Sequence, residues 1–235
     1  PDCVVVVATV KALKLHGGAD KANLSEENLE ALAKGMPNLY KHIENIKHVY
    51  KKPVVVAMNR FASDTPAEIE FVMRGVEKAG AKAVFTDVFL QGGEGGKELA
   101  EAVCEAAMQK SELHYSYDLN DPIEKKISDI VKNVYGGEGA SFSEIAKEKI
   151  AEAEARGYGR LPVIIAKTQY SLSDDAKLLA RPQGFTVHVR DIIVKGGAEF
   201  VVAVAGNIML MPGLGKVPAA EHIGVDEKGE IFGLS

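Results

Sequence analysis

The chain has 235 residues and a formal net charge of -5 at pH 7, with 46% hydrophobic and 26% charged residues. This length can hold one large domain or two modest ones. We see no apolar run of membrane-spanning length and no signal peptide, so we expect a cytoplasmic protein without a membrane partner. The negative charge argues against a nucleic-acid partner.

The sequence contains two cysteines. Cys3 and Cys104 lie in apolar settings without the spacing of a metal site, so we expect buried free thiols in a reducing compartment.

The chain opens with Pro1 and enters the apolar run 4–8 almost at once. A buried strand rarely stands first in a chain without an upstream neighbour. We therefore expect the later part of a longer protein, or one piece of a split one.

The first half of the chain alternates between apolar runs and amphipathic segments. Strands are predicted at 3–10, 53–58 and 83–86, with helices between and after them. Pro37 should interrupt one helix, and Asn38 could cap its continuation. The β-α-β-α-β-α order predicts a parallel sheet with right-handed crossovers.

The second of these strands organises the first half. Its β-branched apolar run is typical of a strand buried on both faces, and it ends in Asn59, Arg60 and Phe61. Thr65 and Glu68 then predict a capping box with proline at the first helical position. Ligands bind beyond the carboxyl ends of strands in an open parallel sheet, so we expect the three residues at the rim of a pocket.

A polar stretch at 111–120 separates two predicted α/β units, residues 1–112 and 113–235. In the second unit, helices are predicted from Ile123 and from Ser143, and Gly136 is read as a left-handed helix end. The predicted strands are 162–166, 185–193 and 200–205. An apolar loop at 209–214 could be a lid, an oligomer contact, or packing against its own domain. The fold class is α/β, with a mostly parallel sheet flanked by helices and a second α/β lobe.

Asn59 could pair through its amide with a purine edge, or it could simply hold its own turn. GTPases place Asn-Lys-x-Asp at such a position, but Arg60 and Ala62 replace the Lys and the Asp here, which argues against guanine. Phe61 and Phe89 each follow a strand, so both rings could reach one crevice. There they could sandwich a flat heterocycle, each stack contributing about 1–3 kcal/mol. Alternatively, both are core residues.

A glycine-rich loop at 92–96 precedes a predicted helix, where backbone N–H groups could approach an anion. A turn at the end of a strand fits this composition equally well. The loop is not a Walker A motif, because Gln91 stands in place of the first glycine and Glu98 in place of the required Ser or Thr. No Walker A motif occurs anywhere in the sequence. The candidate ligand contacts of this loop are Gly92, Gly93, Glu94 and Gly95.

Three further polar residues are weaker candidates. His16 lies beside two glycines, where a structural turn histidine is the alternative. Lys167 and Gln169 lie at the exit of the predicted strand 162–166, which is a site position in α/β sheets. The remaining histidines lack metal-ligand spacing, so we predict no metal site, and no catalytic residue can be assigned.

Stretches throughout the chain, taken together, resemble the formate–tetrahydrofolate ligase family, also called formyltetrahydrofolate synthetases. The resemblance covers essentially the whole chain. The matching stretches are PDCVVVVATVKALK (1–14), HGG (16–18), NL (38–39), KHIEN (41–45), VVVAMNRF (54–61), GGEGG (92–96), LPV (161–163), AKTQYS (166–171), MPGL (211–214) and KVPAAE (216–221).

This resemblance implies an ATP-dependent ligase that joins formate to tetrahydrofolate through formyl phosphate, giving 10-formyltetrahydrofolate, ADP and phosphate. It implies a P-loop-type α/β domain with further α/β lobes, commonly assembled as a homo-oligomer. ATP and Mg²⁺ would be bound mainly by an amino-terminal P-loop segment that this sequence lacks. The chain would then be the carboxyl-terminal part only, inactive by itself, and residues 1–112 would complete the nucleotide- and folate-binding domain.

By the same resemblance, Asn59, Arg60, Phe61 and Phe89 would line a pocket for a flat ring, pterin or adenine, and the loop 92–96 would close against the ligand. The family commonly has Trp where Phe89 stands, and Phe offers less stacking area and no indole N–H. An alternative function is a non-catalytic folate- or nucleotide-binding module. A GTPase-like domain built on Asn59 is a third.

Overall fold

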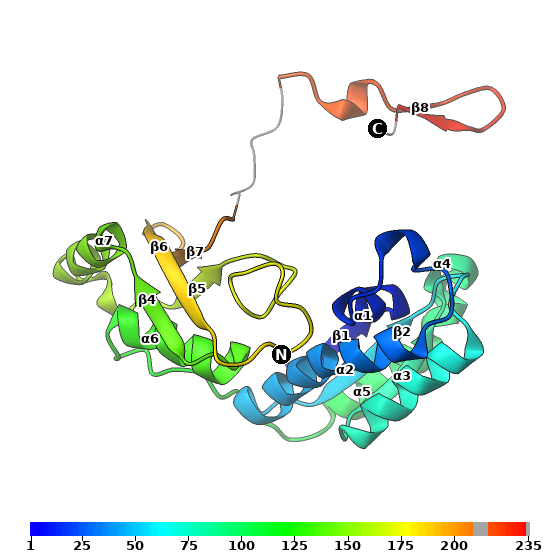
Figure 1. Cartoon of the computed structure of the whole chain (residues 1–235), viewed down its shortest axis with the longest axis horizontal. Coiled ribbons are helices and arrows are strands. Elements are labelled where there is room, and N and C mark those ends of the chain that lie inside the picture. Colours follow the sequence, from blue (N-terminus) through cyan, green and yellow to red (C-terminus); the bar gives the residue numbers. More distant parts are fainter. Residues whose placement is uncertain (209–215, 234–235) are drawn as a thin grey trace.

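The computed structural model describes residues 1–208 and 216–233. It contains a parallel three-stranded sheet in the order β1-β2-β3 and a mixed four-stranded sheet in the order β4-β6-β7-β5, with helices packed against both (Figure 1). The predicted α/β class is therefore confirmed. The first sheet uses residues 4–86 and the second 139–205, while the boundary near 112 stays a prediction. The apolar loop 209–214 lies outside the described residues.

The first lobe holds the first sheet and its helices. Its elements are β1 (Val4–Ala8), α1 (Val10–His16), the 3-10 turn η1 (Lys21–Asn23), α2 (Leu29–Glu44), the π-turn η2 (Asn45–Val49), β2 (Val54–Asn59), α3 (Pro66–Lys78), β3 (Lys82–Thr86), α4 (Val88–Gln91), the 3-10 turn η3 (Gly92–Gly96) and α5 (Lys97–Ala107).

The second lobe holds the mixed sheet, and a small hairpin follows it. Its elements are α6 (Ile123–Ile130), the π-turn η4 (Val131–Tyr135), β4 (Gly139–Phe142), α7 (Glu144–Ala155), η5 (Tyr158–Arg160), β5 (Val163–Ala166), β6 (Thr186–Lys195) and β7 (Phe200–Ala205), then η6 (Ala219–Glu221), β8 (Gly224–Val225) and β9 (Ile231–Phe232).

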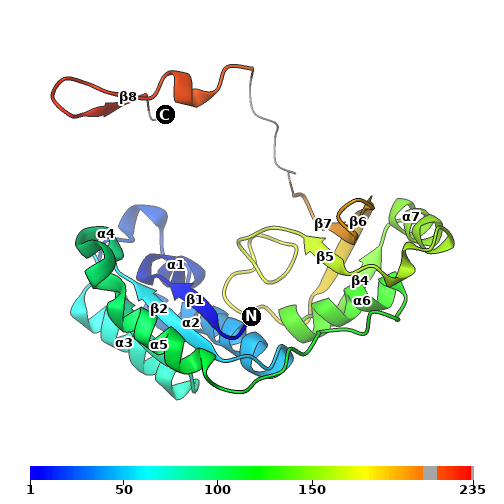
Figure 2. The same cartoon turned by 180° about the vertical axis from the view of Figure 1, so that it is seen from behind.

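Strand β2 is the centre of the first lobe, as its sequence predicts. Five of its six residues are buried, and alternate side chains enter different cores because successive residues point to opposite faces. Val56 and Met58 pack in the core formed with α2 and α3, whereas Val55 packs with Ala102 and Ala106 of α5. Figure 2 shows these helices beside the sheet. Helices therefore cover both faces, and only the strand ends are left for a ligand.

The predicted capping box at the start of α3 is confirmed. The Thr65 hydroxyl accepts a hydrogen bond from the backbone N–H of Glu68 at 3.3 Å, and the Glu68 carboxylate accepts one from the N–H of Thr65 at 3.2 Å. The loop after β2 therefore ends at a fixed helix start.

Two predictions in the first lobe were wrong. The strand expected to reach Val10 ends at Ala8, and α1 begins at Val10 with Thr9 as its N-cap, because Val10 and Leu13 pack into the core at helical spacing. Helix α2 runs through Pro37 without interruption. An internal proline costs about 3 kcal/mol. The buried stripe of α2 outweighs this, since each fully buried apolar side chain contributes about 1.5–3 kcal/mol.

The second lobe departs from expectation at its edges. Gly136 ends a helix in the left-handed conformation as predicted, but β4 then begins at Gly139 and pairs in parallel with β6. The predicted strand at 162–166 forms β5 at the edge of the sheet, where it pairs with β7, and Ile164 is therefore 50% exposed. Cys3 and Cys104 are free, but neither is fully buried. Cys3 is half-buried, and Cys104 is exposed because α5 buries the face that carries Ala102 and Ala106.

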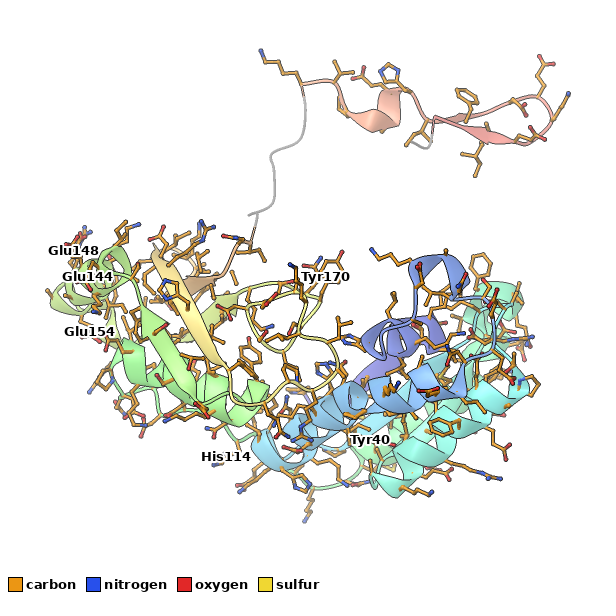
Figure 3. All side chains as sticks on the ribbon, in the orientation of Figure 1. Tyr40, His114, Glu144, Glu148, Glu154 and Tyr170 are labelled. Carbon is orange, nitrogen blue, oxygen red and sulfur yellow. The ribbon has the colours of Figure 1, made fainter. Side chains whose placement is uncertain are left out.

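Helix α2 and the π-turn after it form several of the polar contacts between the two lobes. Arg181 forms an ion pair with Glu44 at 2.7 Å, and the Asn45 amide donates to the carbonyl of Val134 at 2.7 Å. The segment after α5 is also tied back, because the N–H of His114, a residue labelled in Figure 3, donates to the carbonyl of Tyr50 at 3.2 Å. The two sheets are thus held together by polar contacts as well as by the chain.

Candidate functional site

The carboxyl ends of β2 and β3 border one cavity of about 430 Å³. The N–H of Arg60 donates to the carbonyl of Thr86 at 3.2 Å, which joins the two strand ends at the start of the loop. The cavity lies where an open parallel sheet is expected to bind a ligand. Its lining residues are Asn59, Arg60, Phe61, Ala62, Asp87, Phe89 and Leu90.

The structure brings Phe61 and Phe89 to the same cavity, as the positions after successive strands suggested. Neither ring is a core residue, because Phe61 is 42% exposed and Phe89 is 90% exposed. The ammonium of Lys11 lies over the Phe61 ring, 4.8 Å from its centroid. Two open aromatic rings at a cavity rim fit a flat ligand, although binding of a ring between them stays a prediction.

The charges at this rim are paired. Arg60 contacts the Asp87 carboxylate at 3.2 Å, and the Asp87 side chain is only 4% exposed. The Gln91 amide donates to the same carboxylate oxygen at 3.3 Å. The guanidinium is therefore held at the cavity by a buried partner, with donors left over for an anionic or polar ligand group.

Contact between the glycine loop and a ligand stays a prediction. Gly92, Gly93, Glu94 and Gly95 are not among the residues that line this cavity. A Cβ on Gly95 would lie 2.4 Å from the carbonyl oxygen of Asp87, so glycine is needed for packing against the end of β3. The carbonyl of Gly95 accepts from the N–H of Asp87 at 3.2 Å and from the Thr86 hydroxyl at 3.3 Å.

The three weaker candidates, His16, Lys167 and Gln169, meet at a second cavity of about 270 Å³ between the lobes. Sequence reasoning did not place Asn38, His42 and Tyr135 at this cavity, because they come from helix α2 and the π-turn η4. Asn38 and His42 are four residues apart on one helical face, which is the local signal that could have paired them. The other lining residues are Tyr135, Thr168, Ser171 and Leu172.

Lys167 is the dominant charge of this second cavity. Its ammonium lies 4.7 Å from the centroid of the Tyr135 ring and donates to the carbonyls of Thr168 at 3.2 Å, Ser173 at 3.1 Å and Ser171. Burial lowers the pKa of Lys167 to about 8, against an opposing effect of the Asp174 charge. A half-buried cation that already contacts three carbonyls is held firmly in one place.

The two histidines of the second cavity favour their neutral forms. The Nδ1 atom of His16 accepts from the N–H of Ala180 at 3.2 Å, and burial lowers the pKa of His16. Burial also lowers the pKa of His42, and the nearby charges of His16, Lys167 and Lys41 lower it further. Tyr170, labelled in Figure 3, follows β5 on the same loop as Lys167 and is 57% exposed.

Neither cavity contains an evident metal site. Within residues 1–208 and 216–233, no three His, Cys, Asp or Glu side chains come close enough together to hold a metal ion. None of the described helices combines the length and the apolar composition that crossing a lipid bilayer requires.

A comparison with protein families gives one match. The family model for formate–tetrahydrofolate ligase matches residues 1–235, which is the whole of the chain. The match spans the end of β2 with Asn59, the loop with Phe61, helix α4 with Phe89 and both lobes of the structure. The chain therefore belongs to the formate–tetrahydrofolate ligase family.

Proposed function

We propose that this chain provides the ring-binding pocket of a formate–tetrahydrofolate ligase, and that a flat ring, pterin or adenine, lies between Phe61 and Phe89. The observation that carries the proposal is the cavity of about 430 Å³ that both exposed rings border. Stacking on each ring contributes about 1–3 kcal/mol. The Asn59 amide offers both a donor and an acceptor to the ring edge.

The chemistry of the ligation fits such a pocket. Formate is a poor acyl donor and is activated by phosphoryl transfer, which needs cationic groups and Mg²⁺ around the phosphates. The second step, attack of the folate amine on formyl phosphate, depends mainly on how well the two reactants are positioned. Residues at the rim of a rigid sheet serve this second step, because they fix the ring that carries the amine.

We further propose that ATP and Mg²⁺ are bound mainly by a P-loop segment outside these 235 residues. The support is the sequence itself, which holds no Walker A motif. The chain would then need that segment for turnover. Assembly as a homo-oligomer and a cytoplasmic location remain predictions that follow from the family.

Calorimetric titration of the chain with tetrahydrofolate, and separately with ADP, tests the pocket. Phe61→Ala and Phe89→Ala should each weaken binding about 5- to 150-fold, the loss of one stack. Phe71→Ala is the matched control, because Phe71 is a similarly exposed phenylalanine on α3 that does not line the cavity. Absence of heat with both ligands, or an equal effect of Phe71→Ala, would contradict the proposal.

A non-catalytic folate- or nucleotide-binding module is the second candidate, favoured by a ring pocket in a sequence without Walker A residues. An assay with ATP, formate and tetrahydrofolate separates the two. Product formed only after a P-loop segment of the family is added supports the ligase. Binding without product in that mixture supports the module, and turnover by the chain alone contradicts the need for a partner segment.

A further inference from the structure

We propose that Asp64 and Lys11 are positioning residues that hold Phe61 as a fixed platform, while Phe89 on the other side of the cavity is left unheld. Asp64 fixes the backbone of Phe61, and Lys11 covers one face of its ring. The inference rests on the ring-binding role proposed above. It goes beyond that role by assigning residues that touch neither the cavity nor its ligand.

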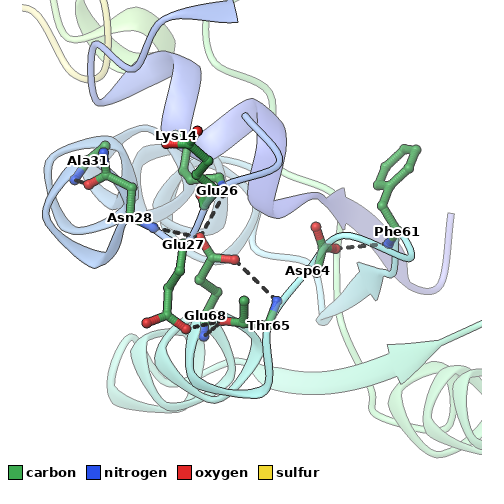
Figure 4. Close-up of polar contacts among 9 residues, drawn as sticks. All are labelled: Lys14, Glu26, Glu27, Asn28, Ala31, Phe61, Asp64, Thr65 and Glu68. Carbon is green, nitrogen blue, oxygen red and sulfur yellow. Dashed lines mark hydrogen bonds and ion pairs between the residues drawn. The ribbon is translucent and has the colours of Figure 1, made fainter. Parts of the chain in front are cut away.

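The backbone of Phe61 is closed into a turn by a single residue. The Asp64 carboxylate accepts a hydrogen bond from the N–H of Phe61 at 2.9 Å, and the N–H of Asp64 donates to the carbonyl of Phe61 at 3.0 Å. Figure 4 shows this carboxylate turned toward the Phe61 nitrogen. The bond to the carboxylate is of the stronger, charge-assisted kind, and Asp64 is only 8% exposed, so water competes little for it.

The far end of this turn is anchored in the core. Thr65 directly follows Asp64, and its N–H donates to the Glu68 carboxylate. That carboxylate is fully buried and also accepts from the Lys14 ammonium at 2.8 Å and from the N–H of Asn28 at 3.0 Å (Figure 4). The turn is therefore fixed to α1, α2 and α3 together, rather than hanging between β2 and α3.

The ring of Phe61 is held from the side of α1. The Lys11 ammonium lies 4.8 Å from the ring centroid, within the range of a cation–π contact. Lys11 does not line the cavity, which indicates that the ring face it covers is turned away from the ligand space. Phe89 differs, since it is 90% exposed on the four-residue helix α4. A ligand would then bind against the ordered Phe61 ring, and the Phe89 ring would close over it. Only Phe89 would lose conformational freedom on binding.

The platform should loosen in acid. Burial raises the pKa of Asp64 and the charge of Glu68 raises it further, while the Phe61 N–H, Lys14 and Lys11 lower it, with a net increase. Among the described residues, one carboxylate oxygen of Asp64 is buried without a hydrogen-bond partner. Protonation at a pH above the usual Asp range would remove the charge that holds the Phe61 N–H, and ring binding should weaken as the pH falls.

The test uses Asp64→Asn and Lys11→Met in the full chain. The controls are Asp20→Asn, because exposed Asp20 also accepts a backbone N–H in a turn, and Lys34→Met on α2. We expect each test variant to weaken tetrahydrofolate binding about 5- to 10-fold and the controls to leave it unchanged. Asp64→Asn should also abolish the pH dependence of the dissociation constant, whereas a merely structural role would leave the profile intact.

Ring dynamics supply the second readout, in ligand-free protein. NMR relaxation of labelled phenylalanine should show a more ordered ring at Phe61 than at Phe89, and loss of this difference in both test variants. Unchanged affinity and unchanged Phe61 order in both variants would overturn the inference. Absence of tetrahydrofolate binding by the wild type would refute the ring-binding function, yet a Phe61 ring loosened by either variant would still support the positioning roles.

Discussion

Replacement of Lys14 by methionine should destabilise the first lobe by about 3 kcal/mol at pH 7. Lys14 and Glu68 form an ion pair at 2.8 Å, and both side chains are 0% exposed. Removing one partner of a buried pair costs about 3–5 kcal/mol, since the other charge stays buried and uncompensated. We expect the lower end of this range, because Glu68 keeps the N–H groups of Asn28 and Thr65.

The destabilisation should depend on pH with a defined sign. Burial raises the pKa of Glu68, but hydrogen bonds from Lys14, Asn28 and Thr65 and the Lys14 charge lower it below its usual value. A carboxyl group with a lowered pKa stabilises the fold above its unfolded pKa, and that stability is lost as pH falls through the folded value. Without Lys14 the pKa of Glu68 rises, so wild type and variant should converge as the pH falls from neutral toward 4.

Urea unfolding followed by far-UV circular dichroism measures both effects. Lys34→Met is the control, because Lys34 pairs with Glu30 on the surface and should change stability by less than about 0.5 kcal/mol. The double variant Lys14→Met/Glu68→Gln should recover part of the loss, since it removes the buried charge. A loss below about 1 kcal/mol for Lys14→Met, or no recovery in the double variant, would refute the reasoning.

Two further substitutions test the packing and the charge of the cavities. Gly95→Ala should cost about 1–3 kcal/mol in a thermal unfolding measurement, because its Cβ would lie 2.4 Å from the Asp87 carbonyl oxygen, while Gly93→Ala, with no atom within 4 Å, should be tolerated. Burial lowers the pKa of Lys167 from 10.5 to about 8, so the unfolded chain binds more protons between these values. The free energy of unfolding of the wild type should therefore rise through that window relative to Lys167→Met, and parallel pH profiles would contradict the burial of the ammonium.

Local sequence signals predicted β2 and the start of α3 because several of them agree. The β-branched run, the polar exit and the Thr-Pro-x-Glu sequence each indicate the same boundary without help from distant residues. Local signals did not predict the start of helix α1. The helix is short and directly follows an apolar run, so its first residues read as a continuation of the strand. Packing against α2 buries Val10 and Leu13 and favours the helix. This contact is with residues distant in the sequence, so a window of ten residues does not reveal it.

The part of the candidate site that follows from the parallel order of the strands was predictable from the sequence. Phe61 and Phe89 follow neighbouring parallel strands, so the shared edge of the sheet brings them together. Lys11 reaches the same ring from α1, and no local pattern predicts that contact. The cavity with Lys167 could not be predicted for the same reason. Its two walls belong to different lobes, and the contact between these lobes depends on single pairs such as Arg181 with Glu44.

The glycine loop shows how a correct residue can be assigned an incomplete role. Its composition indicates close backbone approach, which is real, but the approaching group at Gly95 is the end of β3 rather than the cavity. There the Gly95 carbonyl accepts the N–H of Asp87, and the buried Asp87 carboxylate in turn holds Arg60 at the cavity rim. Any side chain at Gly95 must displace this backbone. Gly95 therefore supports the cavity indirectly. It packs against Asp87, which lines the cavity and pairs with Arg60, and it does not contact the rings itself.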